Sequence, residues 1–190
     1  MLRELVDKNR SHREFKSGVE MTEEMICEWI LNASHCPAAM NLQALKYKIL
    51  TRPEEVAALL PLTRWAASLE KKLPPDGHGP SAFIIMCHDT DIAPMKPIFM
   101  MDVGICAQTI MLSATEAGFG GCIIGSGASD TLSEALSLPN NLVPVLVLGL
   151  GIPEDEVVLT EASDGNTKYY RDENNVHYVP KRSLDEIMIR

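Results

Sequence analysis

The segment from Met100 to Ala117 constrains the fold more than any other part of the sequence, because a helix formed by it is apolar on nearly every face. Such a helix must be buried on most sides, either at the centre of a domain or in an interface between two copies of the chain. Its apolar residues include Val103, Ile105, Cys106, Ala107, Ile110, Met111, Leu112 and Ala114. Glycines between 118 and 127 end this run, so it offers no unbroken apolar stretch of about 20 residues to span a membrane.

Other periodic segments predict a sheet with helices on both of its faces. Helices are predicted from Leu2 to about Asn9, from Thr22, from Pro53, and from Thr63 to Lys72. Strands are predicted at Leu45–Leu50, Ala82–Cys87, Val143–Leu150 and, more briefly, Val176–Val179. Because helices and strands are interleaved but strands are few, we expect one α+β (α/β mixed) domain, residues 1–190, with a mixed sheet of four or five strands.

The chain is acidic, since 17 Lys+Arg and 26 Asp+Glu among 190 residues give a formal net charge of −9. Nucleic acid and anionic membranes attract broad cationic surfaces, so neither is expected as a partner, whereas a small anion held by a few arginines is compatible. The five cysteines include no CxxC pair, and the first residues carry acids where a secretory signal needs an apolar core. We therefore expect a cytoplasmic protein with reduced thiols. The five histidines lack the spacing of a metal site, so no metal is expected.

Two local motifs have both a structural and a functional interpretation. Residues 8–13, Lys-Asn-Arg-Ser-His-Arg, concentrate positive charge in an acidic chain. They either hold a phosphate through charge-assisted hydrogen bonds or lie in solvent at the end of a helix. The glycine-rich segment Gly118–Gly127 matches neither the dinucleotide fingerprint, nor the phosphate loop, nor a nucleophile elbow. It forms either an ordinary cap, strand and turn, or a place where bare backbone N–H groups approach a flat ligand.

Four segments, in order along nearly the whole chain, resemble motifs of the FMN-dependent nitroreductase family. Asn9–Phe15 resembles the opening Arg-Arg-Ser-x-Arg-x-Phe of that family, and Cys36–Gln43 is similar to its Ala-Pro-Ser-x-x-Asn-x-Gln-Pro-Trp. Asp102–Gln108 followed by Ala117–Gly125 resembles the long central helix and the flavin-facing loop. Lys181–Ile187 is similar to the closing arginine and acidic tail.

The resemblance implies a nitroreductase-like fold in an entwined homodimer that binds FMN without a covalent bond. The cofactor-binding residues that it implies are Arg10, Ser11, His12, Arg13, Ala38, Ala39, Met40, Asn41, Gln43, Ile123, Ile124, Gly125 and Arg182. The arginines and Ser11 are expected to hold the phosphate, while Asn41 and Gln43 bond the polar edge of the ring. The loop Gly120–Gly125 is expected to bring a backbone N–H to flavin N5. Residues 39–43 are expected to come from the partner subunit.

The activity that the resemblance implies is hydride transfer from NADH or NADPH, through FMN, to a small electron acceptor in a ping-pong cycle. The expected acceptors are nitroaromatics, quinones or activated alkenes. The motifs contain no dedicated acid or base, so no catalytic side chain is expected and the flavin carries the chemistry. Departures from the family at Asn9, Ala38 and Ala44-Leu45 leave one alternative, a flavin-binding or regulatory protein of the same fold with little turnover. An interaction protein without a cofactor would leave the ordered motifs unexplained.

Overall fold

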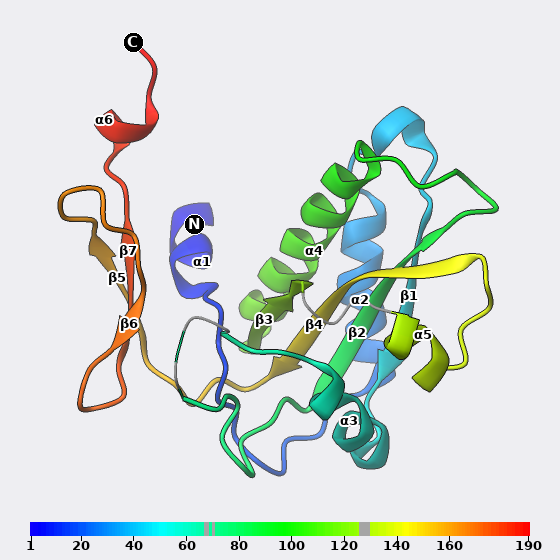
Figure 1. Cartoon of the computed structure of the whole chain (residues 1–190), viewed down its shortest axis with the longest axis horizontal. Helices are drawn as coiled ribbons and strands as arrows, with labels where there is room; N and C mark the ends of the chain where they lie inside the picture. The colour runs from blue at the N-terminus through cyan, green and yellow to red at the C-terminus, as the bar shows by residue number, and fades with distance from the viewer. Residues whose placement is uncertain (67–68, 70, 126–129) are drawn as a thin grey trace. The chain divides into compact units, whose positions relative to one another are not determined.

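The computed structural model describes residues 1–66, 69, 71–125 and 130–190, which divide into two compact units, Met1–Pro153 and Glu154–Arg190. The helices of the first unit are α1 (Leu2–Lys8), α2 (Glu23–Ser34), α3 (Pro53–Leu59), α4 (Phe99–Glu116) and α5 (Asp130–Ala135), with short 3-10 turns η1 (Ala39–Asn41) and η2 (Leu60–Leu62) (Figure 1). Its strands are β1 (Leu45–Leu50), β2 (Ala82–Asp89), β3 (Gly120–Ile124) and β4 (Leu142–Gly151). Within the described residues, no helix is both long enough and apolar enough to cross a membrane.

The strands of the first unit form one antiparallel sheet in the order β1-β2-β4-β3. Every residue of β2 is buried, which explains why its segment Ala82–Cys87 is a continuous apolar run rather than an alternating one. At the β3 edge, the N-terminal segment adds a parallel bridge between Ser11 and Gly121, and His12 N donates to Gly121 O at 2.9 Å. The predicted α+β class is thus confirmed, and the sheet has four strands where four or five were predicted. Its four strands are antiparallel, and the one parallel pairing among the described residues at this edge is the isolated bridge at Ser11.

Each face of the sheet has its own hydrophobic core. On one face α2 and α4 lie side by side, and Ile84 of β2 packs with them (Figure 1). On the other face, Phe83 of β2 packs with residues of α3 and with Trp65. Gly149 of β4 lies beneath the Trp65 ring, where a Cβ atom would come within 2.6 Å of the indole. Phe83 and Ile84 are neighbours on β2, and each packs into the hydrophobic core on its own face of the sheet.

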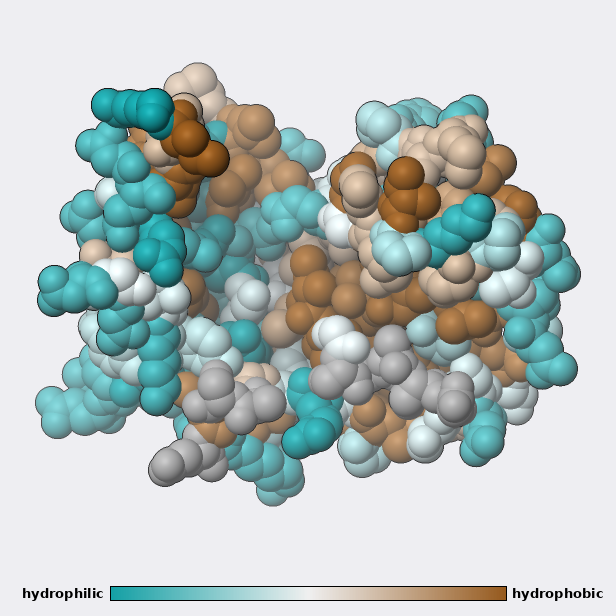
Figure 2. Space-filling view, turned by 45° about the horizontal axis from the view of Figure 1, so that its top comes forward, coloured by the Kyte–Doolittle hydropathy of each residue, from teal (hydrophilic) through white to brown (hydrophobic). Residues whose placement is uncertain are grey.

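Helix α4 is covered along one side and open along the other. Its buried residues are Phe99, Asp102, Val103, Cys106, Ala107, Ile110, Met111 and Ala114. Met101 and Ile105 remain 64% and 41% exposed, and a Cβ atom on Gly104 would meet nothing within 4 Å. The face that Figure 2 shows carries several patches of hydrophobic residues. The predicted helix is confirmed, and Met101, Gly104, Ile105 and Gln108 form an open stripe along it.

Most of the predicted elements of the first unit are confirmed with small shifts of boundary. Helix α2 begins after Thr22, whose hydroxyl accepts a hydrogen bond from Met25 N at 3.3 Å. Helix α3 begins at Pro53, as predicted from the preference of proline for a first helical turn. The glycine-rich segment forms β3 up to Ile124, whereas Ser126 and Gly127 lie outside the described residues.

The helix predicted from Thr63 to Lys72 is wrong for the residues of that segment that the structure describes, which are non-helical. Thr63 Oγ1 donates to Leu60 O at 2.7 Å and accepts a hydrogen bond from Trp65 Nε1, also at 2.7 Å. These bonds stop the turn η2 and direct Trp65 into the core against Phe83. A long-range aromatic contact thus overrides the local helical pattern.

The second unit contains a small sheet in the order β5 (Val157–Glu161), β7 (His177–Lys181), β6 (Tyr170–Arg171), followed by α6 (Leu184–Ile187). The strand predicted from Val176 is confirmed as β7, which runs parallel to β5 and antiparallel to β6. Arg171 Nη2 lies 3.2 Å from Asp155 Oδ2 in an ion pair whose side chains are almost fully buried. That residues 1–190 act as a single domain stays a prediction.

Candidate functional site

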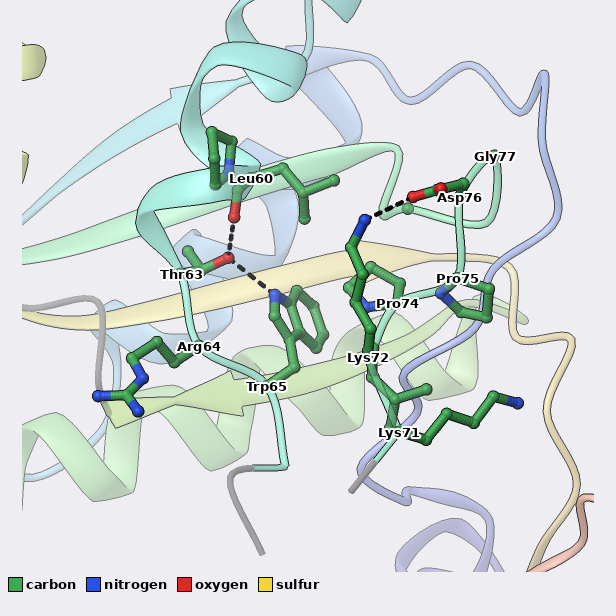
Figure 3. Close-up of a pocket in the computed structure, with 13 residues that line it drawn as sticks. Leu60, Thr63, Arg64, Trp65, Lys71, Lys72, Pro74, Pro75, Asp76 and Gly77 are labelled. Atoms are coloured by element: carbon green, nitrogen blue, oxygen red, sulfur yellow. Dashed lines mark hydrogen bonds and ion pairs between the residues drawn. The ribbon is translucent and has the colours of Figure 1, made fainter. Parts of the chain in front are cut away.

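A cavity of about 570 Å³ lies between η2 and the loop that precedes β2 (Figure 3). Arg64, Lys71 and Lys72 lie around it, and the Trp65 indole forms part of its wall. Lys72 Nζ is paired with Asp76 Oδ1 at 2.8 Å. No site is predicted here from the sequence, although three basic residues between 64 and 72 of an acidic chain were an available signal. The volume of this cavity is within the range of small-molecule pockets.

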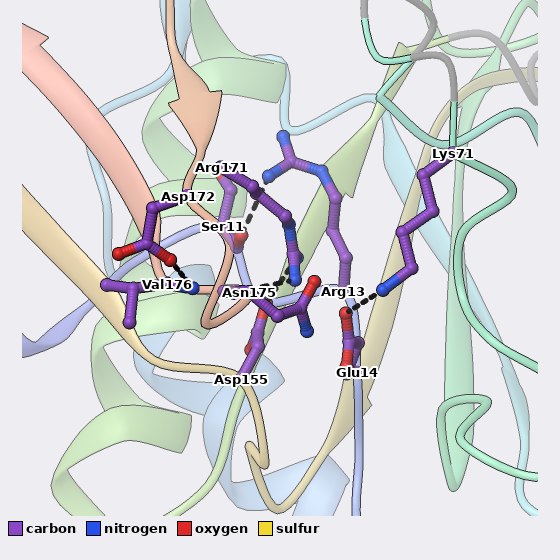
Figure 4. Close-up of polar contacts among 9 residues, drawn as sticks. All are labelled: Ser11, Arg13, Glu14, Lys71, Asp155, Arg171, Asp172, Asn175 and Val176. Atoms are coloured by element: carbon purple, nitrogen blue, oxygen red, sulfur yellow. Dashed lines mark hydrogen bonds and ion pairs between the residues drawn. The ribbon is translucent and has the colours of Figure 1, made fainter.

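The predicted phosphate-binding segment follows α1 and runs beside the edge strand β3. Asn9 ends α1 with an extended backbone, φ −73° and ψ 98°, and the chain then pairs with β3 at Ser11. Arg13 Nη1 donates to Ser11 O at 3.0 Å, and Glu14 Oε1 is paired with Lys71 Nζ at 3.7 Å (Figure 4). The Glu14–Lys71 pair brings the wall of the large cavity next to this basic segment.

A second, smaller cavity of about 80 Å³ joins the basic segment to β3 and α4. It is lined by Asn9, Arg10, Ser11, Gln108, Met111, Gly121 and Ile123. The two motifs that had alternative interpretations, the basic cluster and the glycine-rich segment, therefore lie against one another. Gln108 was not predicted as a site residue. The signal for it was the one carboxamide on a helix that is mostly apolar.

Arg10 carries a positive charge that its surroundings only partly compensate. Its Nη2 donates to Val6 O at 2.6 Å, whereas its buried Nε has no hydrogen-bond partner among the described residues. Burial lowers the pKa of Arg10, and the nearby Asp7 carboxylate opposes this only in part. A partly buried guanidinium in this state favours an anionic group beside it, and the adjoining cavity has space for one. The residues present therefore fit a phosphate group.

The predicted flavin-facing residues at the end of β3 differ in what they expose. Ile123 is 41% exposed and lines the small cavity, whereas the Ile124 side chain is buried in the core beneath the sheet. Gly125 is exposed, and a Cβ atom there would meet nothing within 4 Å. His12 lies over Gly120, where an added Cβ atom would come within 2.9 Å of the imidazole. Only backbone atoms of Ile124 remain for contact with a ligand.

The second predicted segment, residues 38–43, is held by α4 and has an unusual backbone. Ala39 N donates to Asp102 Oδ1 at 2.9 Å, which anchors η1 to the first turn of α4. Met40, Asn41 and Gln43 have φ angles of 52°, 54° and 52°, in the left-handed region. For residues other than glycine this conformation costs about 1–3 kcal/mol each, and it concentrates at functional sites.

The structure places the predicted residues in two groups within one chain. Residues 38–43 contact α4 at Asp102, whereas Arg10 and Ser11 share their cavity with Gln108 and Met111. With a helical rise of 1.5 Å per residue, these points lie roughly 9–14 Å apart along the helix. Ala38 and Gln43 instead line a third cavity, of about 140 Å³.

Arg182 lies in the second unit, where its Nη1 is 3.5 Å from Glu186 Oε1. Its contribution to a phosphate site stays a prediction. Within the described residues, no group of three or more His, Cys, Asp or Glu side chains is placed to hold a metal ion.

Known proteins resemble this chain in sequence and in fold. The model of the nitroreductase family matches residues 6–152, which include three of the four motif segments. A nitroreductase family protein from Streptococcus pneumoniae TIGR4 has a TM-score of 0.70 at 16% identity, over 100% of both chains. The NADPH:FMN oxidoreductase from Vibrio harveyi, solved with NAD+, has a TM-score of 0.63 at 25% identity, over 80% of this chain and 69% of that one. A nitroreductase-like protein from Exiguobacterium sibiricum 255-15, solved with FMN, has a TM-score of 0.65 at 20% identity, over 82% of this chain and 89% of that one.

The backbone of Met40 supplies a test of strain in segment 38–43. Met40→Gly should raise the free energy of unfolding by about 1 kcal/mol, because glycine adopts a positive φ without the Cβ clash. Met40→Ala is the matched control, since it removes the 69% exposed side chain but keeps the Cβ atom. Urea unfolding of both variants measures the difference. Equal stability of the two variants would mean that the left-handed backbone stores no strain.

Proposed function

The chain belongs to the nitroreductase family, and we propose that it is a cytoplasmic, FMN-dependent oxidoreductase that transfers electrons from NADH or NADPH to a small organic acceptor. The observation that carries the proposal is the incompletely compensated Arg10 guanidinium beside a cavity shared with Ser11 and Gly121. The names of the solved relatives support it, since one is an NADPH:FMN oxidoreductase with NAD+ and another contains FMN.

When bound, FMN would supply the redox chemistry, accepting hydride from the nicotinamide and passing it to a nitroaromatic, quinone or activated alkene in a ping-pong cycle. The chain's own residues bind and orient this group. Arg10 and Ser11 hold the phosphate by charge-assisted hydrogen bonds, and Arg13 adds a second positive charge on the same segment. Arg13 would also stabilise negative charge on the reduced flavin ring. We assign no side chain as a proton donor or acceptor.

Asn41 and Gln43 are suited to the polar edge of the ring. Both are exposed, and Gln43 Nε2 donates to Asn41 O and Oδ1 at 3.3 Å, which is long for such bonds. The carboxamides can therefore exchange these weak bonds for bonds to ring oxygens and nitrogens. The open backbone at Gly125 is the corresponding candidate on β3 for a donor to the ring.

A homodimer would bring the two groups of site residues together. Within one chain, residues 38–43 and the Arg10 cavity are separated along α4. The open stripe of α4 exposes Met101 and Ile105 around Gly104, whose missing side chain permits close approach of another helix. We therefore propose that α4 lies in a dimer interface, and that the partner subunit's segment 38–43 completes each flavin site.

Arg13 and Asn41 predict different effects on the binding of FMN and riboflavin. Arg13→Ala should weaken FMN binding about tenfold to a hundredfold, because a charge-assisted contact contributes roughly 1.5–3 kcal/mol. It should weaken binding of riboflavin, which has no phosphate, much less. Asn41→Ala should weaken both flavins by similar factors, because it addresses the ring. Fluorescence titration of each variant with each flavin is the measurement, and an equal loss for both flavins in Arg13→Ala contradicts the phosphate assignment.

Reduction by nicotinamide separates an enzyme from a flavin-binding protein. Anaerobic mixing of FMN-loaded protein with NADH or NADPH should bleach the flavin faster than steady-state turnover, as a ping-pong cycle requires. Purified protein that stays colourless after incubation with FMN would contradict the cofactor itself. Tight FMN binding without reduction by either nicotinamide would instead establish the alternative, a regulatory or flavin-binding protein with the departures at Asn9, Ala38 and Ala44-Leu45.

The open stripe of α4 predicts the effect of a charge on assembly. Ile105→Glu should convert a dimer into a monomer, because a carboxylate buried in an apolar interface is costly. Its FMN affinity should fall as well, since the partner's segment 38–43 is lost. Ala57→Glu places the same charge on the exposed face of α3 and should leave the dimer intact. Sedimentation of both variants tests this; a dimeric Ile105→Glu with normal FMN affinity would place the interface elsewhere.

A further inference from the structure

Two of the five cysteines converge at the junction of α2 and α4. Cys36 lies just after α2, and Cys106 lies in the middle of α4. Cys106 Sγ donates to Ala33 O at 3.6 Å, and Cys36 N donates to the same carbonyl oxygen at 3.1 Å. Cys36 Sγ lies 3.1 Å from the hydroxyl of Thr109, which is one helical turn after Cys106. Both thiols therefore meet at the same side of α4.

The two thiols also share a cavity. The cavity of about 140 Å³ that Ala38 and Gln43 line is bordered by Cys36 and Cys106, with Tyr47 and Asp102 beside them. Its volume is sufficient for a small oxidant to reach the sulfur atoms. Neither thiol is used in the proposed binding of FMN, so the pair is a separate chemical feature of the fold.

The other cysteines are not placed to form such a pair. Cys27 is exposed on α2, whereas Cys87 and Cys122 are buried in the core on the other face of the sheet. Cys87 lies opposite Pro144 of β4, and Cys122 lies opposite Gly149. Positions five residues apart on a strand are separated by about 17 Å, which is too far for a disulfide.

We propose that Cys36 and Cys106 are an oxidation-sensitive thiol pair, which a peroxide converts into a disulfide that joins the end of α2 to α4. The Cys36 sulfur attacks one peroxide oxygen, the O–O bond breaks, and Cys36 becomes a sulfenic acid while the thiol proton leaves with the other oxygen as water. The Cys106 thiol then attacks the sulfenic sulfur, forming the S–S bond and releasing the second oxygen as water. One hydrogen peroxide is reduced to two waters, and two thiols are oxidised to one disulfide.

The surroundings set the order of the two steps. Cys36 is half-buried, whereas Cys106 is 8% exposed. Burial raises the pKa of Cys106, which makes this thiol less reactive toward peroxide than a more exposed one. Cys36 is therefore the thiol that meets the oxidant first, and Cys106 resolves it.

The disulfide would restrain the segment that the proposed function uses. Cys36 begins the chain that leads to Ala39, which is already hydrogen-bonded to Asp102 on α4. A covalent bond from Cys36 to the same helix adds a second anchor one turn away from Asp102. Oxidation would thus lock residues 36–43 onto α4, independently of any bound cofactor.

The direct test is chemical. Reduced protein treated with a small excess of hydrogen peroxide should lose two of its five free thiols, and a non-reduced digest should contain a peptide that links Cys36 to Cys106. Dithiothreitol should restore both thiols. The proposal is overturned if the digest lacks that linked peptide and peroxide has instead oxidised Cys27 or converted Cys36 to the sulfinic acid.

Variants and stability supply the controls. Cys36→Ser should abolish the loss of paired thiols, whereas Cys27→Ser, which removes the exposed thiol on α2, should leave the disulfide unchanged. The oxidised protein should unfold at a higher urea concentration than the reduced protein, because the bond constrains the unfolded chain. An oxidised form with an unchanged or lower midpoint contradicts the proposed crosslink. None of these readouts depends on FMN binding or on turnover.

Discussion

Burial of one side of α4 against the central sheet and α2 organises the first unit. The helix is nearly free of charge, so its inner side, which includes Ile110 and Met111, packs against the buried strand β2 in one core. Its remaining polar groups are few, and each has a distinct position. Asp102 anchors residues 38–43, Cys106 contacts the end of α2, and Gln108 lines the cavity at Arg10. Because a helix is rigid at 1.5 Å per residue, α4 sets the distances between these features.

Two features of the first unit destabilise the folded chain in the absence of a ligand. Arg10 is desolvated beside a cavity and lacks a complete set of hydrogen bonds. Residues 40, 41 and 43 hold left-handed backbone conformations without glycine. A folded protein retains such costs where surrounding structure imposes them, and a bound anion would offset the first by supplying charge and acceptors. Both features coincide with segments that resemble the cofactor-binding motifs of the family, which supports a ligand-binding role.

The segment around Arg10 and Arg13 concentrates positive charge locally, although the chain as a whole is acidic. The chain carries a net charge of −9, yet Arg10 and Arg13 lie within one short segment. At physiological ionic strength, charges farther away than about 8 Å are largely screened, so the overall negative charge has little effect at this segment. Nearby acids matter more. Glu14 is paired with Lys71, and Asp7 only partly offsets the burial of Arg10. Local pairing, rather than net charge, therefore decides where an anion is attracted.

Local patterns in the sequence were sufficient for several features. Uninterrupted apolar segments located α4 and β2, a strand-like mixture of apolar and basic residues located β1, a proline marked the start of α3, and ordered short motifs indicated the family that matches residues 6–152. Other features depend on contacts between distant segments and followed only from the folded chain. These contacts drew Trp65 into the core where a helix was expected, placed Gln108 beside Arg10, separated residues 38–43 from that cavity, and brought Cys36 to Cys106. Residue spacing encodes which faces of a helix or strand are apolar, but not which partner each face meets, because that choice is made by packing the whole chain at once.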